Sequence, residues 1–213
     1  HVTQRGNRRQ KVFFSEKDFG HYRRLLAESC RHCETVCWAY CLMPNHVHLV
    51  LVPGHPDGLR AALAEAHRRY TRHVNFREGW RGHLWQERFH SFPMDEEHLL
   101  AAVRYVERNP VKAGLTRAAA DWSWSSAVAH LRGVDDRLVT VQPMLERMHD
   151  WAAYLSGGDD PTAVERLRKH SRTGRPAGSQ GFLEIAEKIS GRSLRPRTCG
   201  RRSRRDEHRT GAK

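Results

Sequence analysis

Leu42-Met-Pro-Asn-His-Val-His-Leu-Val-Leu-Val-Pro53 is a short apolar stretch that carries two histidines near its start. It is too short for a buried helix, is rich in β-branched residues and is bounded by prolines, and this pattern predicts a β-strand. Because strand side chains alternate between faces, His46 and His48 lie on one face, and Val47 and Leu49 lie on the other. Both faces are largely apolar, so we expect a central strand in which the two imidazoles could share one divalent cation.

The histidine pair also has a plainer interpretation, in which both side chains are hydrogen-bonded and partly buried without binding a ligand. Metal catalysis on a phosphate requires, besides the ion, an attacking group placed in line with the bond that breaks. The choice between the two interpretations therefore depends on whether the rest of the chain supplies a third ligand and a nucleophile.

The composition indicates a basic protein that binds polyanions. The chain has 213 residues, enough for one domain with an appendage, and a formal net charge of +13. Nucleic acid is the commonest intracellular polyanion. No apolar run reaches membrane-spanning length and no secretory signal is visible, so we expect a cytoplasmic protein that does not associate with membranes. Five cysteines, an odd number, favour reduced and buried thiols over disulfides or a zinc site.

The first third of the chain alternates between strand and helix patterns. Residues 1–14 predict a short strand, a turn at Gly6-Asn7 and a return of the chain. Ser15 is expected to cap a helix, with Asp18 three residues later in a weak form of the capping box. Residues 34–43 predict a strand that forms an antiparallel hairpin with the histidine strand.

Further along the chain, residues 57–76 predict a helix, residues 82–94 predict a strand, and the segment from Asp95 to about Arg108 predicts a helix that Pro110 ends. The resulting order of strand, helix, strand, strand, helix, strand, helix is an α+β pattern. We therefore expect a ferredoxin-like or RRM-like central antiparallel sheet with helices packed on it, followed by a basic C-terminal extension.

The helix after Asp95 carries a tyrosine and an asparagine on one stripe. Its buried stripe is expected to contain Leu99 and Val103, so Tyr105 and Asn109, four residues apart, project together from the neighbouring stripe. If this helix covers the histidine face, a phenol and an amide oxygen lie beside the two imidazoles. Otherwise, a packed tyrosine and a helix-terminating asparagine explain the same residues.

Four stretches of the chain have a distinctive composition when they are read together. They are His1-Val-Thr-Gln-Arg-Gly-Asn-Arg-Arg9, Ala39-Tyr-Cys-Leu-Met-Pro-Asn-His-Val-His-Leu49, Gly82-His-Leu-Trp-Gln-Glu-Arg-Phe89 and Arg104-Tyr-Val-Glu-Arg-Asn-Pro-Val-Lys-Ala-Gly-Leu115. In this order they resemble the REP-associated tyrosine transposases, which are bacterial single-tyrosine relatives of the insertion-sequence transposases in the HUH endonuclease superfamily. The resemblance covers residues 1 to about 130.

The resemblance implies an enzyme. It makes His46-Val47-His48 the metal-binding HUH motif and Tyr105 the nucleophile, and it places Asn109 where the third metal ligand is expected. Should Asn109 not bind the metal, Gln86 and Glu107 are the next candidates. The family uses Mg²⁺ or Mn²⁺, recognises repetitive extragenic palindromes that fold as DNA hairpins, and cleaves single-stranded DNA nearby. By resemblance, cleavage leaves a 5′-phosphotyrosine and a free 3′-hydroxyl.

We expect residues 1–130 to form the catalytic domain and residues 131–213 to form a partly helical basic region with a flexible DNA-binding tail. Seven arginines and no carboxylate lie between Arg192 and Arg205, and a Gly-Asn turn flanked by arginines in the first strand suits a phosphate backbone. A solvated turn and a solvated charged tail are the alternatives. The expected DNA-binding residues are Arg5, Asn7, Arg8, Arg9, Lys11, Arg88, Lys112, Arg175, Arg195 and Arg197.

Two other classes of protein remain as alternatives. One is a non-catalytic DNA-binding protein derived from a transposase, which would bind the hairpin without cutting DNA. The other is a metal-dependent RNA-processing enzyme on an RRM-like sheet, which would not need Tyr105. For all three classes we expect a monomer rather than a dimer.

Overall fold

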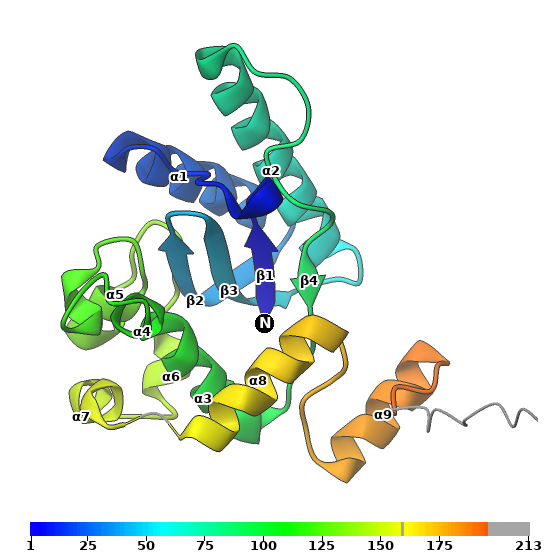
Figure 1. The fold of residues 1–213 in the computed structure, drawn as a ribbon. Helices are drawn as coiled ribbons and strands as arrows, with labels where there is room; N and C mark the ends of the chain where they lie inside the picture. Colours follow the sequence, from blue (N-terminus) through cyan, green and yellow to red (C-terminus); the bar gives the residue numbers. More distant parts are fainter. Residues whose placement is uncertain (159, 196–213) are drawn as a thin grey trace, which may run out of the picture.

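The structure, a computed structural model, describes residues 1–158 and 160–195 of the chain. It has the α+β architecture expected from the sequence, with one antiparallel sheet and helices on both of its faces (Figure 1). With η marking 3₁₀-helices, the elements of these residues are β1 (Val2–Arg5), η1 (Asn7–Arg9), α1 (Glu16–His32), β2 (Thr35–Met43), β3 (His46–Pro53), α2 (Gly58–Glu78), β4 (His90–Ser91), α3 (Glu96–Glu107), α4 (Asn109–Lys112), η2 (Ala119–Asp121), α5 (Ala127–Arg132), α6 (Gln142–Leu145), α7 (Trp151–Ser156), α8 (Pro161–Thr173) and α9 (Gln180–Ser190).

The histidine strand β3 is central in the sheet, as predicted. The strand order is β2-β3-β1-β4, and neighbouring strands are antiparallel. β2 and β3 form the expected hairpin, in which Cys41 lies opposite His48 and Met43 lies opposite His46. On the other side of β3, Thr3 of β1 pairs with His48. Both imidazoles thus project from a strand that is paired along both edges, which fixes their direction.

Different helices cover the two faces of the sheet. Helices α1 and α2 cover the face on which Val47 and Leu49 pack, and with them they form the larger hydrophobic core. Helix α3 covers the opposite face, where Val106 lies in one buried cluster with Val50 (Figure 1). The helix that carries Tyr105 therefore lies over the histidine face, which is the arrangement that a joint site requires.

Two helices begin at the capping residues that the sequence predicted. In the first turn of α1, Asp18 accepts hydrogen bonds at 2.9 Å from the backbone amides of Phe14 and Ser15, and these bonds complete a capping box with the N-cap residue Ser15. Before α3, Asp95 accepts a hydrogen bond at 3.1 Å from the backbone amide of His98. These bonds fix where each helix starts, and for α3 they also fix which residues face the sheet.

The chain turns at Gly6-Asn7, as predicted, and forms η1 there. The following residues run into the core without joining the sheet. The backbone amides of Val12 and Phe13 both donate to the carbonyl oxygen of Pro44, at 2.9 and 3.2 Å. Both side chains are buried, so burial of two apolar groups, and not strand pairing, decides the path of this segment.

The predicted strand over residues 82–94 is too long, because within it only His90–Ser91 (β4) pairs as a strand. Gly82 and Glu87 have positive φ angles of 91° and 55°, which turn the backbone away from extended geometry. The segment still follows β1, since the backbone amide of Gln86 donates to the carbonyl oxygen of Arg5 at 2.8 Å.

Helices α6, α7 and α8, which follow residue 130, pack against the sheet and its helices. Met144 of α6 and Trp151 of α7 belong to the buried cluster beneath α3, and Leu167 of α8 is buried together with Phe92. The domain boundary at residue 130 stays a prediction, and Arg197, with most of the predicted tail, lies outside the described residues. In the described part of the chain, no helix is both long and apolar enough to cross a membrane. The cysteines described there are free thiols: Cys30, Cys33, Cys37 and Cys41.

Candidate functional site

His46 and His48 present neutral imidazoles to one side of the sheet. Their ring centroids lie 5.0 Å apart. Burial lowers the pKa of His46 to about 4 and lowers the pKa of His48 well below its usual range. The side-chain oxygen of Asn45 can only accept, so neutral His46 donates its Nδ1 proton to it at 2.6 Å. The lone pair on His46 Nε2 is therefore available to bind a ligand.

Tyr105 and Asn109 project together from the end of α3 and the start of α4. The ring centroids of Tyr105 and His48 lie 5.6 Å apart, with the rings perpendicular. The Tyr105 hydroxyl makes no hydrogen bond to any residue that the structure describes. Asn109 donates from Nδ2 to the carbonyl oxygen of Tyr105 at 3.2 Å, which leaves its Oδ1 available to accept a hydrogen bond or to bind a cation.

These four side chains line one cavity of about 700 Å³. Its walls include residues of β1, β3, β4, α3, α4 and α8, so segments that are far apart in the sequence meet there. Among the described residues that line it, one carries a carboxylate, Glu165. The lysine and arginines in the same wall are Arg5, Lys112, Arg168 and Arg172. This excess of positive charge favours an anionic ligand beside Tyr105.

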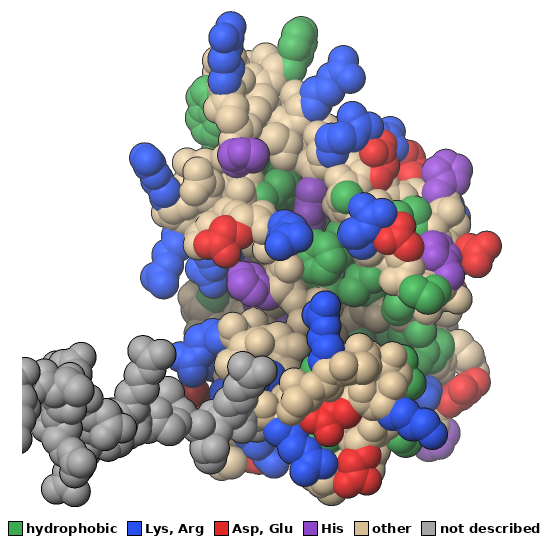
Figure 2. All heavy atoms as spheres, turned by 90° about the vertical axis from the view of Figure 1, so that its right-hand side faces the viewer, with side chains coloured by type: hydrophobic (Ala, Val, Ile, Leu, Met, Phe, Trp, Pro, Cys, Tyr) green, Lys and Arg blue, Asp and Glu red, His purple; other side chains and the backbone are tan. Residues whose placement is uncertain are grey.

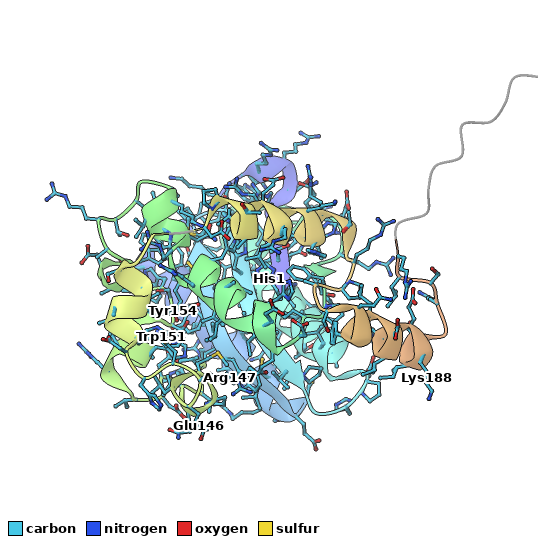
Figure 3. All side chains as sticks on the ribbon, turned by 90° about the horizontal axis from the view of Figure 1, so that it is seen from below. His1, Glu146, Arg147, Trp151, Tyr154 and Lys188 are labelled. Atoms are coloured by element: carbon cyan, nitrogen blue, oxygen red, sulfur yellow. The ribbon has the colours of Figure 1, made fainter. Side chains whose placement is uncertain are left out.

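A third histidine, His1, stacks against His48. Figure 3 shows His1 where β1, α3 and α8 come close together. The two rings are stacked with centroids 5.3 Å apart, and His1 Nε2 lies 3.1 Å from His48 Nδ1. On its other side, His1 Nδ1 lies 3.5 Å from the hydroxyl of Ser171 in α8. The sequence interpretation missed this residue, although alternation along β1 places His1 and Thr3 on the same face, and Thr3 pairs with His48.

Glu107 is not available as a metal ligand, so that expectation from the sequence is wrong. Its side chain is fully buried on another side of α3. The carboxylate accepts hydrogen bonds from Ser126 Oγ at 2.5 Å, from His130 Nδ1 at 2.6 Å and from Trp151 Nε1 at 2.9 Å. Gln86, the other alternative, does line the cavity.

The donor atoms in the cavity fit a divalent cation with open coordination positions. Neutral imidazole nitrogens and an amide oxygen are ligands that divalent metals accept, and the cavity leaves room for phosphate and water. Within residues 1–158 and 160–195, no group of three or more His, Cys, Asp or Glu side chains is placed to hold a metal ion. Asn109, or an oxygen from outside the chain, would therefore have to complete a site on His46 and His48. The metal and its ligands stay predictions.

The predicted DNA-binding residues are spread over several parts of the surface. Arg5 and Lys112 line the cavity beside Tyr105. Asn7, Arg8 and Arg88 line a neighbouring depression of about 1000 Å³. Lys and Arg side chains are distributed over the face on which β4 and α9 lie, interspersed with Asp and Glu side chains (Figure 2).

The remaining predicted contacts differ in how accessible they are. Arg9 and Lys11 are exposed, Arg175 is half-buried after α8, and Arg195 lies 3.6 and 3.5 Å from the carboxylates of Glu184 and Glu187. Arg8 and Arg9 have positive φ angles of 53° and 62°, which are costly for residues other than glycine. The turn thus keeps both arginine side chains exposed although their backbone conformation costs free energy.

Residues 1–109 match the family model described as IS200-like transposases. This match covers 109 of the 213 residues, just over half of the chain. The chain belongs to the IS200-like transposase family. The match ends at Asn109, so both histidines and Tyr105 lie inside the family region, whereas α8 lies outside it.

Two more specific relatives confirm the resemblance to the REP-associated tyrosine transposases. A Haemophilus influenzae protein that carries the name REP-associated tyrosine transposase is 27% identical to this IS200-like transposase over 116 residues. The match spans 49% of this chain and 66% of that protein, slightly less than two thirds of its length. A solved structure of a REP-associated tyrosine transposase bound to a REP hairpin has the same fold, with a TM-score of 0.52 and 21% identity over 65% of this chain and 82% of the other.

Proposed function

We propose that this transposase is a metal-dependent single-stranded DNA endonuclease and strand transferase that recognises hairpins of repetitive extragenic palindromes. The observation that carries the proposal is the meeting of Tyr105, Asn109, His46 and His48 in one basic cavity. A phosphodiester repels nucleophiles because it is negatively charged, and a basic cavity lowers that barrier. The hairpin partner is proposed from the two REP-associated relatives.

Tyr105 is the nucleophile in this proposal. Its hydroxyl oxygen attacks the phosphorus, the bond between phosphorus and the 3′ oxygen of the upstream nucleotide breaks, and the phenolic proton ends on that 3′ oxygen. The products are a 5′-phosphotyrosine and a free 3′-hydroxyl, and attack by a 3′-hydroxyl on the phosphotyrosine reverses the step. Bound by His46, His48 and Asn109, Mg²⁺ or Mn²⁺ would neutralise and orient a non-bridging phosphate oxygen.

The environment of Tyr105 supports this role more than a packing role. A tyrosine that serves only to pack within a core usually donates its hydroxyl to a protein acceptor, as Tyr154 does to the carbonyl oxygen of Leu100. Tyr105 lines the cavity, and its hydroxyl has no such acceptor among the described residues. Lys112 Nζ lies 4.5 Å from the centroid of its ring, so a positive charge is held close to the phenol.

The test is covalent capture of DNA on Tyr105. We would incubate the protein with Mn²⁺ and a palindrome hairpin that has a single-stranded flank labelled downstream of the cut, and then look for a protein-DNA band on a denaturing gel. Tyr105→Phe removes only the hydroxyl, so it should bind the hairpin normally and give no band. Tyr154→Phe is the matched control, because it loses a hydroxyl outside the cavity and should still give the band.

Two outcomes would contradict the proposal in different ways. Cleavage by Tyr105→Phe would make water or another side chain the nucleophile. A wild-type protein that binds the hairpin tightly but never cuts would establish the alternative, a DNA-binding protein derived from a transposase.

A further inference from the structure

The helix α8, which follows the family region, forms one wall of the cavity that contains Tyr105. Four of its residues line the cavity: Glu165, Arg168, Ser171 and Arg172. Arg168 and Arg172 are four residues apart and therefore project from the same side of the helix, about 6 Å apart along its axis. Neither arginine is among the DNA-binding residues expected from the sequence.

The position of α8 is fixed by contacts at its middle and at its end. Leu167 is 4% exposed and packs in a buried cluster with Phe92. After the helix, the backbone amide of Ala177 donates to the carbonyl oxygen of Pro93 at 2.9 Å, and the amide of Asp95 donates to the carbonyl oxygen of Ala177 at 3.0 Å. The segment that starts α3 is thus bonded to the segment that follows α8, which fixes α8 and its arginines beside the cavity.

Arg168 and Arg172 are cations without a protein partner. Neither forms an ion pair or a side-chain hydrogen bond with any described residue, and both are exposed. Arg60 and Arg68 of α2 provide the comparison, because each pairs with a carboxylate three residues earlier, at 2.6 and 2.8 Å. Arg168 has Glu165 at the same spacing but does not pair with it, so its charge remains available to a ligand in the cavity.

We infer that α8 is a phosphate clamp for the single strand, in which Arg168 and Arg172 bind consecutive backbone phosphates next to the one that Tyr105 attacks. The inference rests on the proposed action on single-stranded DNA and assigns part of the substrate site to the region beyond the family match. Arginine suits the role because its planar guanidinium donates two hydrogen bonds to one phosphate. The helix axis places the two charges at a separation similar to that of neighbouring phosphates in an extended strand.

The test measures binding of single-stranded DNA without cleavage. We would compare the wild-type protein with the double variant Arg168→Gln/Arg172→Gln in anisotropy titrations of a fluorescent oligothymidylate, over a series of salt concentrations and without metal. The matched control is Arg166→Gln/Lys169→Gln, which removes the same charge from cavity-distant positions of α8. Because all four side chains are exposed, every variant should keep the wild-type Tm.

Loss of two phosphate contacts has a defined expected size. For single strands the slope of log K against log salt changes by about 0.7 per contact, so the slope should fall by about 1.4 and the affinity at 0.1 M salt by about 25-fold. The control double variant loses no direct contact, so by the same relation its slope should stay unchanged. Binding of a blunt-ended hairpin should be the same in all three proteins.

Three results would overturn the inference. Equal losses in both double variants would mean that α8 contributes only general charge. A matching loss of blunt-hairpin affinity would place α8 on the duplex surface, and an unchanged slope would remove these arginines from the DNA site. If the clamp behaves as expected but Tyr105 forms no adduct, the proposed cleavage fails while the clamp stands; if the adduct forms and the slope is unchanged, only the clamp fails.

Discussion

Replacing Glu107 with glutamine should destabilise the protein through one identifiable contact. Glu107 Oε1 accepts from Ser126 and His130, whereas Oε2 accepts from the indole nitrogen of Trp151 at 2.9 Å. A glutamine of the same shape can keep its carbonyl oxygen toward Ser126 and His130. Its amide nitrogen then faces the Trp151 N–H, so two donors oppose each other and the indole loses its acceptor.

The size of the effect follows from the burial of this pair. Glu107 is 0% exposed and Trp151 is 3% exposed, so water cannot replace the lost acceptor. Leaving one buried donor unsatisfied costs about 1–3 kcal/mol, and the bond lost here was to a carboxylate, so we expect about 2–3 kcal/mol. Glu107→Ala removes the acceptor of all three donors and should cost about 3–5 kcal/mol, a large part of the ~5–15 kcal/mol that stabilises a typical domain.

The assay is urea unfolding followed by far-UV circular dichroism, with Trp151→Phe as the second substitution of a double-mutant cycle. In the Trp151→Phe background, Glu107→Gln should cost at least about 1 kcal/mol less than in the wild type, because the donor that it opposes is gone. Equal costs in the two backgrounds would refute the assignment of Trp151 as the partner. If Glu107→Gln left the free energy of unfolding unchanged, Glu107 would not be the acceptor that the buried Trp151 indole requires.

Two further predictions concern histidines. Changing His1 to phenylalanine keeps a ring beside His48 but removes the nitrogen that contacts His48 Nδ1. The affinity for Mn²⁺, measured by calorimetry, should therefore fall about 10- to 100-fold, while hairpin binding is unchanged. Unaltered Mn²⁺ binding would show that His1 only packs. Burial lowers the pKa of His67 to about 3, and its Nε2 accepts from Tyr22 in the neutral form. Below pH ~6.5 the His67 side chain binds a proton in the unfolded chain but not in the folded protein. The free energy of unfolding should therefore decrease by up to about 1.4 kcal/mol per pH unit as the pH is lowered from ~6.5 to ~3. Urea titrations of His67→Gln should show a smaller decrease over this range.

Much of the candidate site could be predicted because two strict periodicities determine it. Alternation along β3 placed His46 and His48 on one face, and it held because the strand is covered on both sides and cannot slip by one residue. The four-residue spacing of Tyr105 and Asn109 placed them together, and the capping residue Asp95 fixed the start of their helix. Neither argument could establish that the helix covers the histidine face, which depends on contacts between distant segments.

The failed predictions concern features that hydrophobic periodicity does not encode. The left-handed conformation of Glu87 interrupts the predicted strand over residues 82–94, although no glycine or proline marks that position. Glu107 was named as an alternative ligand, but it follows Tyr105 by two residues, and this step of about 200° around the helix turns it toward Trp151. The packing of α8 could not be predicted because its sequence is mostly charged. Leu167 is the one residue of this helix that is buried in the core.

The position of Tyr105 depends on groups that lie on two sides of α3 and that both come from late in the chain. On one side, Ser126, His130 and Trp151 bind the carboxylate of Glu107. On the other side, α8 packs Leu167 against the α3 cluster and brings its basic face to the cavity. A nucleophile on the surface of a helix has few neighbours of its own to fix it, so the rigidity of the whole helix must do so. Residues beyond the family match thus set the geometry in which the proposed chemistry of Tyr105 would operate.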